Sequence, residues 1–143
     1  MALVELSFPA RPAHVRTARQ VAVSLARRGG LTEDLLDEIR LAVAEACGLT
    51  LSVLQRTRQE GPVAVDFDDS DGFAVEIRAG ASLPSATGTT ALDVLAEAAA
   101  GGDTEELPAG AALAVLAEVA PVLEATTSRE GLRLRLAWPP VPD

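Results

Sequence analysis

The first thirty residues show two kinds of hydrophobic spacing. Residues 3–8, LVELSF, alternate apolar and polar side chains, which is typical of a strand with one buried face. Two prolines then interrupt the pattern, and from Pro12 or Ala13 apolar residues return at spacings of three and four. These residues are Val15, Ala18, Ala22 and Leu25. The spacing predicts a helix, and the RRGG sequence at residues 27–30 predicts its end.

A longer helix is predicted to begin after Thr32. Thr32 is a suitable N-cap, and Glu33 and Asp34 suit the positive end of the helix dipole. The polar sequence QRTRQEGP at residues 55–62 predicts the end of this helix. One apolar stripe at helical spacing runs along it, formed by Leu35, Ile39, Ala42, Ala46, Leu49 and Val53.

Two hairpins are predicted further along the chain. PVAVDF at residues 62–67 and GFAVEIRA at 72–79 are β-type runs, and the DDSDG sequence that joins them favours a tight turn. VLEATTS at residues 122–128 and GLRLRLAW at 131–138 form the second pair. In the last strand Leu132, Leu134 and Leu136 alternate with Arg133 and Arg135, so both arginines are expected on the open face of a sheet.

The segment between the hairpins differs in composition. Residues 79–110 are mostly small and polar, with one short predicted helix at 90–100, TALDVLAEAAA. We expect this segment to be a mobile, lid-like connection rather than a second domain, because it has too few large apolar residues for a core of its own. AALAVLAEVA at residues 111–120 predicts another helix, with Leu113 and Leu116 facing inward.

The order of these elements predicts an α+β fold. Strands flank helices without regular alternation, which favours a two-layer sandwich. We expect one mixed, mostly antiparallel sheet with helices on one face. The chain is predicted to form a single domain over residues 1–139, followed by a tail at 140–143.

The composition excludes several kinds of chemistry. All 12 basic residues are arginine, so neither a P-loop lysine nor a Schiff-base lysine is present. With one His and one Cys, the usual zinc ligand sets cannot form, and no metal site is expected. For His14 a solvated or capping role is favoured over catalysis, and Cys47 is expected to be a small core residue.

Charge and hydropathy restrict the partners and the compartment. The net charge is −9 and no basic stripe is present, which disfavours nucleic acid and anionic membranes as partners. No apolar run is long enough to span a bilayer, and no signal peptide is recognised. A single cysteine is compatible with a reducing environment, so we expect a cytoplasmic protein.

One carboxylate interrupts the apolar run of the second predicted helix. Glu45 stands in LAVAEACGLTLSVL, residues 41–54, and the position four residues later is Leu49. A residue four positions on shares the same helix face, but leucine offers no polar partner there. From the residues alone, Glu45 is either a boundary glutamate of the helix or a functional base.

The chain resembles the RsbW/SpoIIAB-type anti-sigma factor serine kinases over residues 2–139. These kinases belong to the GHKL (HATPase_c, Bergerat-type) ATPase superfamily, which includes the ATP-binding domains of histidine kinases. The resemblance rests on four segments and on the interval that separates Arg19 from Glu45. The segments are HVRTAR at 14–19, LLDEIRLAVAEAC at 35–47, FAVEIR at 73–78 and residues 110–139. It implies a GHKL two-layer sandwich.

The resemblance also implies where ATP and Mg²⁺ would bind, and these positions are degenerate here. On the second helix Glu45 matches the base of the family, but Leu49 replaces the metal-binding asparagine, and leucine has no oxygen for a hard cation. Ala79 replaces the adenine-reading aspartate. Ala81, Leu83 and Ala112 replace glycines that surround the nucleotide, and Gly110 is retained. We therefore expect Glu45 to be vestigial and no cofactor to be bound.

The function expected from this resemblance is a regulatory, protein-binding one. The domain would be an anti-sigma-factor-like pseudokinase that binds a STAS-domain antagonist, a sigma factor, or both, without phosphorylation. Family precedent assigns partner contacts to the first helix, here Arg16 and Arg19, although both could be ordinary surface residues. The alternative is an active ATP- and Mg²⁺-dependent serine kinase. A homodimer, or a heterodimer with a GHKL relative, is also open.

Overall fold

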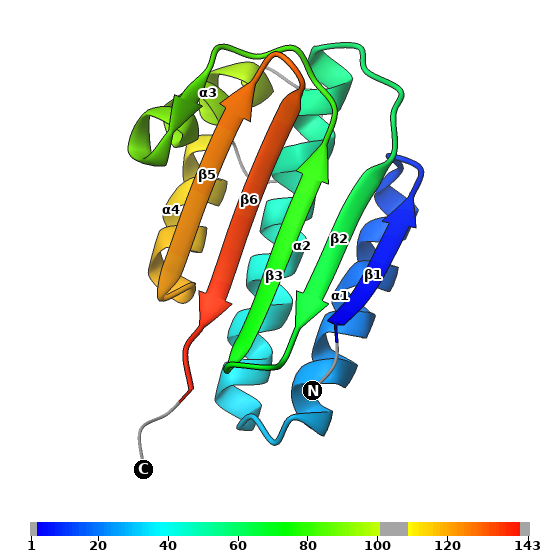
Figure 1. The fold of residues 1–143 in the computed structure, drawn as a ribbon, viewed down its shortest axis with the longest axis vertical. Helices are drawn as coiled ribbons and strands as arrows, with labels where there is room; N and C mark the ends of the chain where they lie inside the picture. Colours follow the sequence, from blue (N-terminus) through cyan, green and yellow to red (C-terminus); the bar gives the residue numbers. More distant parts are fainter. Residues whose placement is uncertain (1–2, 101–108, 141–143) are drawn as a thin grey trace.

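The described residues form a sheet of six strands and four helices in two layers (Figure 1). The structure is a computed structural model and describes residues 3–100 and 109–140. The strands are ordered β1-β2-β3-β6-β5-β4 across the sheet. Every strand pairing within these residues is antiparallel, so the expectation of a mixed sheet was wrong, and the sheet is antiparallel throughout. The α+β sandwich is confirmed.

The first half of the chain follows the predicted pattern closely. Strand β1 spans Leu3–Phe8, helix α1 spans Pro12–Arg28, and helix α2 spans Glu33–Arg56. Thr32 caps α2 as predicted, because its side-chain oxygen accepts a hydrogen bond from the Leu35 backbone nitrogen at 3.3 Å. Strands β2 (Val63–Asp68) and β3 (Phe73–Ala79) form the first hairpin.

The second half contains two helices and the second hairpin. Strand β4 (Ala86–Thr87) leads into helix α3 (Gly88–Ala99). Helix α4 (Ala109–Val119) precedes β5 (Val122–Ser128) and β6 (Gly131–Trp138). The final hairpin and both helices were predicted. The tail at 140–143 lies outside the described residues except for Pro140.

The lid-like region is more firmly packed than its composition suggested. Within its described part, residues 79–100, helix α3 buries Ala91, Leu95 and Ala99, which recur every four residues. Helix α3 packs against α2, α4 and β5. Small side chains allow this close packing, so even a segment with few large residues joins the core. Residues 101–108 of the expected lid lie outside the described residues.

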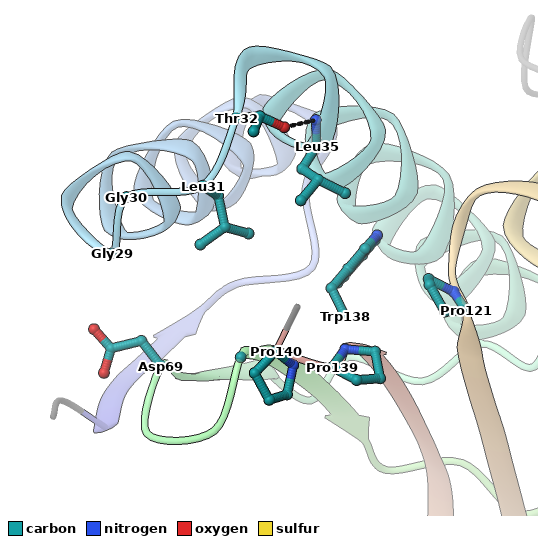
Figure 2. Close-up of a pocket in the computed structure, with 11 residues that line it drawn as sticks. Gly29, Gly30, Leu31, Thr32, Leu35, Asp69, Pro121, Trp138, Pro139 and Pro140 are labelled. Carbon is teal, nitrogen blue, oxygen red and sulfur yellow. Dashed lines mark hydrogen bonds between the residues drawn. The ribbon is translucent and has the colours of Figure 1, made fainter. Parts of the chain in front are cut away.

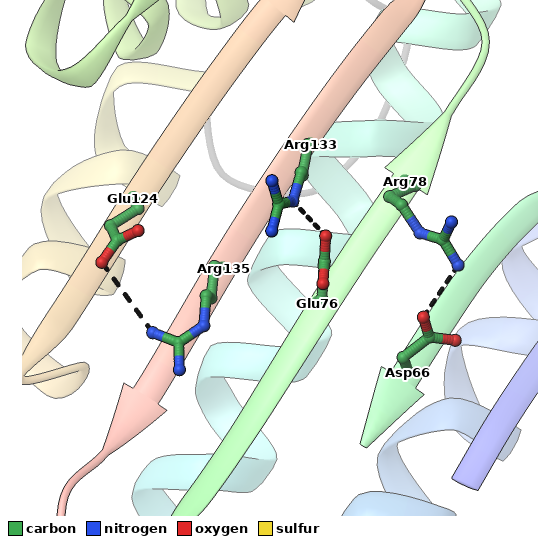
Figure 3. Close-up of polar contacts among 6 residues, drawn as sticks. All are labelled: Asp66, Glu76, Arg78, Glu124, Arg133 and Arg135. Atoms are coloured by element: carbon green, nitrogen blue, oxygen red, sulfur yellow. Dashed lines mark hydrogen bonds and ion pairs between the residues drawn. The ribbon is translucent and has the colours of Figure 1, made fainter. Parts of the chain in front are cut away.

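The open face of the sheet is polar, as predicted from β6. Arg78 on β3 lies directly opposite Arg133 on β6, and each is ion-paired with an acid on the neighbouring strand (Figure 3). Arg78 contacts Asp66 at 2.8 Å, and Arg133 contacts Glu76. A like-charged cross-strand pair is unfavourable, and these contacts offset it.

Candidate functional site

Helix α2 places the two diagnostic positions of the resemblance in different environments. Glu45 is partly buried, and Leu49 is 3% exposed and belongs to the hydrophobic core. The two residues lie one helical turn apart. The position that would hold Mg²⁺ is therefore occupied by a packed apolar side chain.

The segment after β3 is equally apolar. Ala79, Ala81 and Leu83 are buried at 9%, 4% and 5% exposure, and all three belong to the same core cluster as Leu49. The Leu83 backbone nitrogen donates a hydrogen bond to the Ser128 carbonyl oxygen at 3.0 Å, which fixes this segment to the end of β5. None of these three side chains could hydrogen-bond an adenine ring.

The start of α4 completes the set of positions that the resemblance assigns to nucleotide. Gly110 is exposed, and a Cβ atom built on it would meet no heavy atom within 4 Å. Ala112 is 4% exposed. Because glycine has no Cβ atom, it allows a phosphate to approach the backbone of a tight loop closely. Of these two positions, only Gly110 is a glycine.

The residues present do not fit a Mg²⁺–ATP complex. Within the described parts of the chain, no group of three or more His, Cys, Asp or Glu side chains could hold a metal ion. The positions that would supply polar contacts are instead packed in the core with Leu95 of α3. A hard cation needs oxygen ligands, and the buried Leu49 supplies none.

Helix α1 presents the second predicted site, a basic face. Arg16 is exposed and Arg19 is partly buried, one turn apart on the same side of the helix. Helix α1 contains no acidic residue, while the whole chain has a net charge of −9. The arginines therefore form a local positive region on an acidic protein.

His14 takes a structural position on α1. Its ring lies 5.6 Å from the ring of Phe8 between centroids, at an interplanar angle of 35°, and it is partly buried. His14 therefore packs against the end of β1. The expected solvated or capping role was wrong, because the proline-containing turn brings the two rings together.

Sequence analysis missed a cavity at the other end of α2. It has a volume of about 400 Å³ and lies where four segments meet (Figure 2). The α1–α2 turn, the β2–β3 turn, the start of β5 and the end of β6 each contribute. The lining residues are 29–32, Leu35, Asp69, Gly72, Pro121 and 138–140. The Gly29–Gly30 pair, Trp138 and the Pro139–Pro140 pair can be seen in the sequence, but only the fold brings these residues together.

Cys47 and Asp68, both among the described residues, have pKa values that depart from the ordinary ones. Burial raises the pKa of the Cys47 thiol to about 12. Hydrogen bonds from Ser70 lower the pKa of Asp68, the last residue of β2. Cys47 is a core residue, as predicted, and its protonated thiol is unsuited to act as a nucleophile near neutral pH.

The comparison with known families agrees with this architecture. Residues 8–138 match the histidine kinase-like ATPase domain, so the chain belongs to that family. The match covers nearly the whole described fold, from the end of β1 to the end of β6. No curated protein matches the chain. No helix among the described residues is both long and apolar enough to cross a membrane.

Proposed function

We propose that this histidine kinase-like ATPase domain is a protein-binding regulator that has lost ATP-dependent phosphorylation. It would act as an anti-sigma-factor-like pseudokinase that binds a STAS-domain antagonist, a sigma factor, or both. The proposal is supported by the contrast between the nucleotide positions and the basic face of α1. The substituted nucleotide positions, such as Leu49 and Ala79, are buried and apolar, whereas Arg16 on α1 is exposed in a positive region without acids.

A nucleotide bound at these positions would lack several polar contacts. A phosphate or adenine group that enters without its partner must give up hydrogen bonds to water, at a cost of ~1–3 kcal/mol for each unpaired polar group. Leu49 and Ala79 each remove one such partner, and Ala112 adds a methyl group where the family has glycine. Several losses of this size remove most of the binding free energy of a micromolar ligand, which is about 8 kcal/mol.

Nucleotide titration tests the first half of the proposal. Calorimetry of the wild type with millimolar Mg²⁺–ATP is expected to show no saturable heat. The Leu49→Asn, Ala79→Asp double variant is the comparison, because it returns two polar groups to these positions. Saturable Mg²⁺-dependent binding by the wild type would overturn the loss of nucleotide binding.

Partner capture tests the second half. The domain is expected to co-purify with a STAS-domain protein or a sigma factor, and the Arg16→Glu, Arg19→Glu variant is expected to lose at least about tenfold in affinity. The Arg56→Glu, Arg58→Glu variant is a matched control, since it makes the same change in charge at exposed residues at the end of α2 and just beyond it. Equal loss in both variants would show a general charge effect rather than an α1 site.

Active serine kinase function is the alternative, and the partly buried Glu45 favours it. That hypothesis predicts phosphate transfer to a partner serine that Glu45→Ala abolishes. A third arrangement, pairing with itself or with a competent relative, would be detected by measuring molecular mass alone and in a mixture. Neither arrangement requires the cavity beside Trp138.

A further inference from the structure

The cavity beside Trp138 lies far from both faces discussed above. Along α2, Leu35 at the cavity and Leu49 at the nucleotide positions are 14 residues apart, which corresponds to about 21 Å of helix. Along α1, Arg19 precedes Gly29 by ten residues, or about 15 Å. A ligand in this cavity would therefore contact neither the nucleotide positions nor Arg19.

The walls of the cavity are rigid. Trp138 is only 2% exposed and forms the inner end, and its indole nitrogen donates a hydrogen bond to the Val119 carbonyl oxygen at 3.2 Å. Turning the ring into the cavity would break this bond and leave a buried donor unpaired. Pro121, Pro139 and Pro140 have fixed backbone angles. The Trp138 ring therefore cannot turn into the cavity without losing this hydrogen bond.

Two further aromatic rings, those of Phe73 and Phe67, lie in a row beside the Trp138 ring. The Phe73 ring lies 6.5 Å from the Trp138 ring, and the Phe67 ring lies 6.4 Å from the Phe73 ring. Three of the four aromatic residues of the chain are thus gathered at this end of the sheet. Aromatic pairs of this kind add stability beyond their buried area.

The inner surface is apolar, and the β2–β3 turn beside it is acidic. Leu31, Leu35 and Trp138 provide the apolar surface, and Figure 2 shows Asp69 across the cavity from Leu35. The lining segments 29–35 and 68–72 contain no basic residue. They contain five acids, namely Glu33, Asp34, Asp68, Asp69 and Asp71. On the opposite side, α1 ends with Arg27 and Arg28 directly before Gly29, and Arg27 is ion-paired with Glu33 at 3.9 Å.

We infer that this cavity binds a peptide segment of a partner protein in which a leucine-sized apolar side chain stands between basic residues. The apolar side chain would enter against Leu31, Leu35 and Trp138, and the basic residues would lie beside the β2–β3 turn. A cavity of about 400 Å³ has room for a single anchoring side chain of this kind. The acidic β2–β3 turn differs in charge from the Arg16 and Arg19 face of α1, so the two surfaces select different partners.

NMR spectra of N–H groups provide the test, because the protein already contains suitable amide and indole N–H groups at the cavity. Trp138 is the only Trp, so its indole N–H gives one isolated signal, and Gly29, Gly30 and Gly72 report on two walls. The ligands are two short peptides, acetyl-Arg-Leu-Leu-Arg-amide and acetyl-Glu-Leu-Leu-Glu-amide. The basic peptide is expected to shift these four signals saturably, with a dissociation constant on the order of 0.1–1 mM. The acidic peptide is expected to bind at least about fivefold more weakly.

Two pairs of variants separate the apolar and charged contributions. Leu31→Gln is expected to weaken binding of the basic peptide about tenfold, whereas Leu3→Gln, at a Leu that is 63% exposed on β1, is expected to leave it unchanged. Asp69→Asn should weaken it about two- to fivefold, and Asp93→Asn on the exposed side of α3 should not.

Two results would overturn the inference. One is the absence of saturable shifts at Trp138 and the three glycines with a peptide concentration of several millimolar. The other is equal binding of the basic and acidic peptides. The Arg16→Glu, Arg19→Glu variant should bind the basic peptide normally, so failure here is distinguishable from failure of the proposed regulatory function.

Discussion

A Cβ atom on Gly72 would lie 2.2 Å from the backbone oxygen of Trp138. The β2–β3 turn therefore approaches the end of β6 at a distance that only glycine permits. Gly72 also has a φ angle of +74°, which side chains rarely adopt. This contact positions the turn that contains Asp69 beside Trp138 and so forms one wall of the cavity.

Gly72→Ala is expected to lower the free energy of unfolding by about 2–4 kcal/mol, because the methyl group meets backbone atoms that cannot rotate away. Urea denaturation measures the change. Gly61→Ala is the control, since a Cβ atom there would meet nothing within 4 Å and its φ angle is not positive. Similar unfolding midpoints for both variants would contradict the close approach.

Leu49→Asn is expected to destabilise the domain by about 3–5 kcal/mol, because it removes a buried apolar side chain and buries an amide. The same substitution at Leu41, which is 42% exposed on the same helix, is expected to cost less than about 1 kcal/mol. Thermal or urea unfolding compares the two. Tolerance of Asn at position 49 would indicate an open, polar environment there and would weaken the case against nucleotide binding.

Thr127→Val is expected to loosen the lid-like segment that follows β3. The Thr127 hydroxyl is buried and donates a hydrogen bond to the Pro84 carbonyl oxygen at 2.6 Å. Valine keeps the shape but leaves that oxygen without its donor, at a cost of about 1–2 kcal/mol. Hydrogen exchange should then rise in β4 and α3. Thr126→Val, at an exposed neighbour, should leave the exchange of these elements unchanged.

Cys47 is expected to react with a thiol reagent only when the protein opens, since the buried thiol has a pKa of about 12. Because the folded state holds this proton more tightly than the unfolded state, the contribution of Cys47 to stability is constant below pH 9. Between pH 9 and 12 it should fall by up to about 1.4 kcal/mol per pH unit. Comparison with Cys47→Ala, which cannot show this fall, isolates the contribution. Rapid labelling of the native protein at pH 8 would contradict it.

Much of the architecture followed from local patterns. The alternation in LVELSF, the stripe along α2 and the cap at Thr32 each depend on neighbours within a few residues, and each was confirmed. Arg133 and Arg135 were placed on the open face for the same reason, because alternate side chains of a strand point to opposite faces. Periodicity is a local property, so these features could be predicted.

The errors arose where distant segments meet. The sheet proved antiparallel throughout, which depends on strand order rather than on any one strand. His14 was expected in solvent, but the turn after β1 places its ring on Phe8. Residues 79–100 looked too small to pack, yet Leu95 of α3 is fully buried against neighbouring elements.

The sequence by itself determined most of the helices and strands and which of their faces are apolar. Composition and short-range spacing are sufficient for these conclusions, because they require no knowledge of what packs against what. The tertiary structure decided that Leu49 and Ala81 lie in one core, and that Leu31, Asp69 and Trp138 surround one cavity. Burial and cavities depend on contacts between residues far apart in the chain, and those contacts exist only once the sheet and helices have assembled.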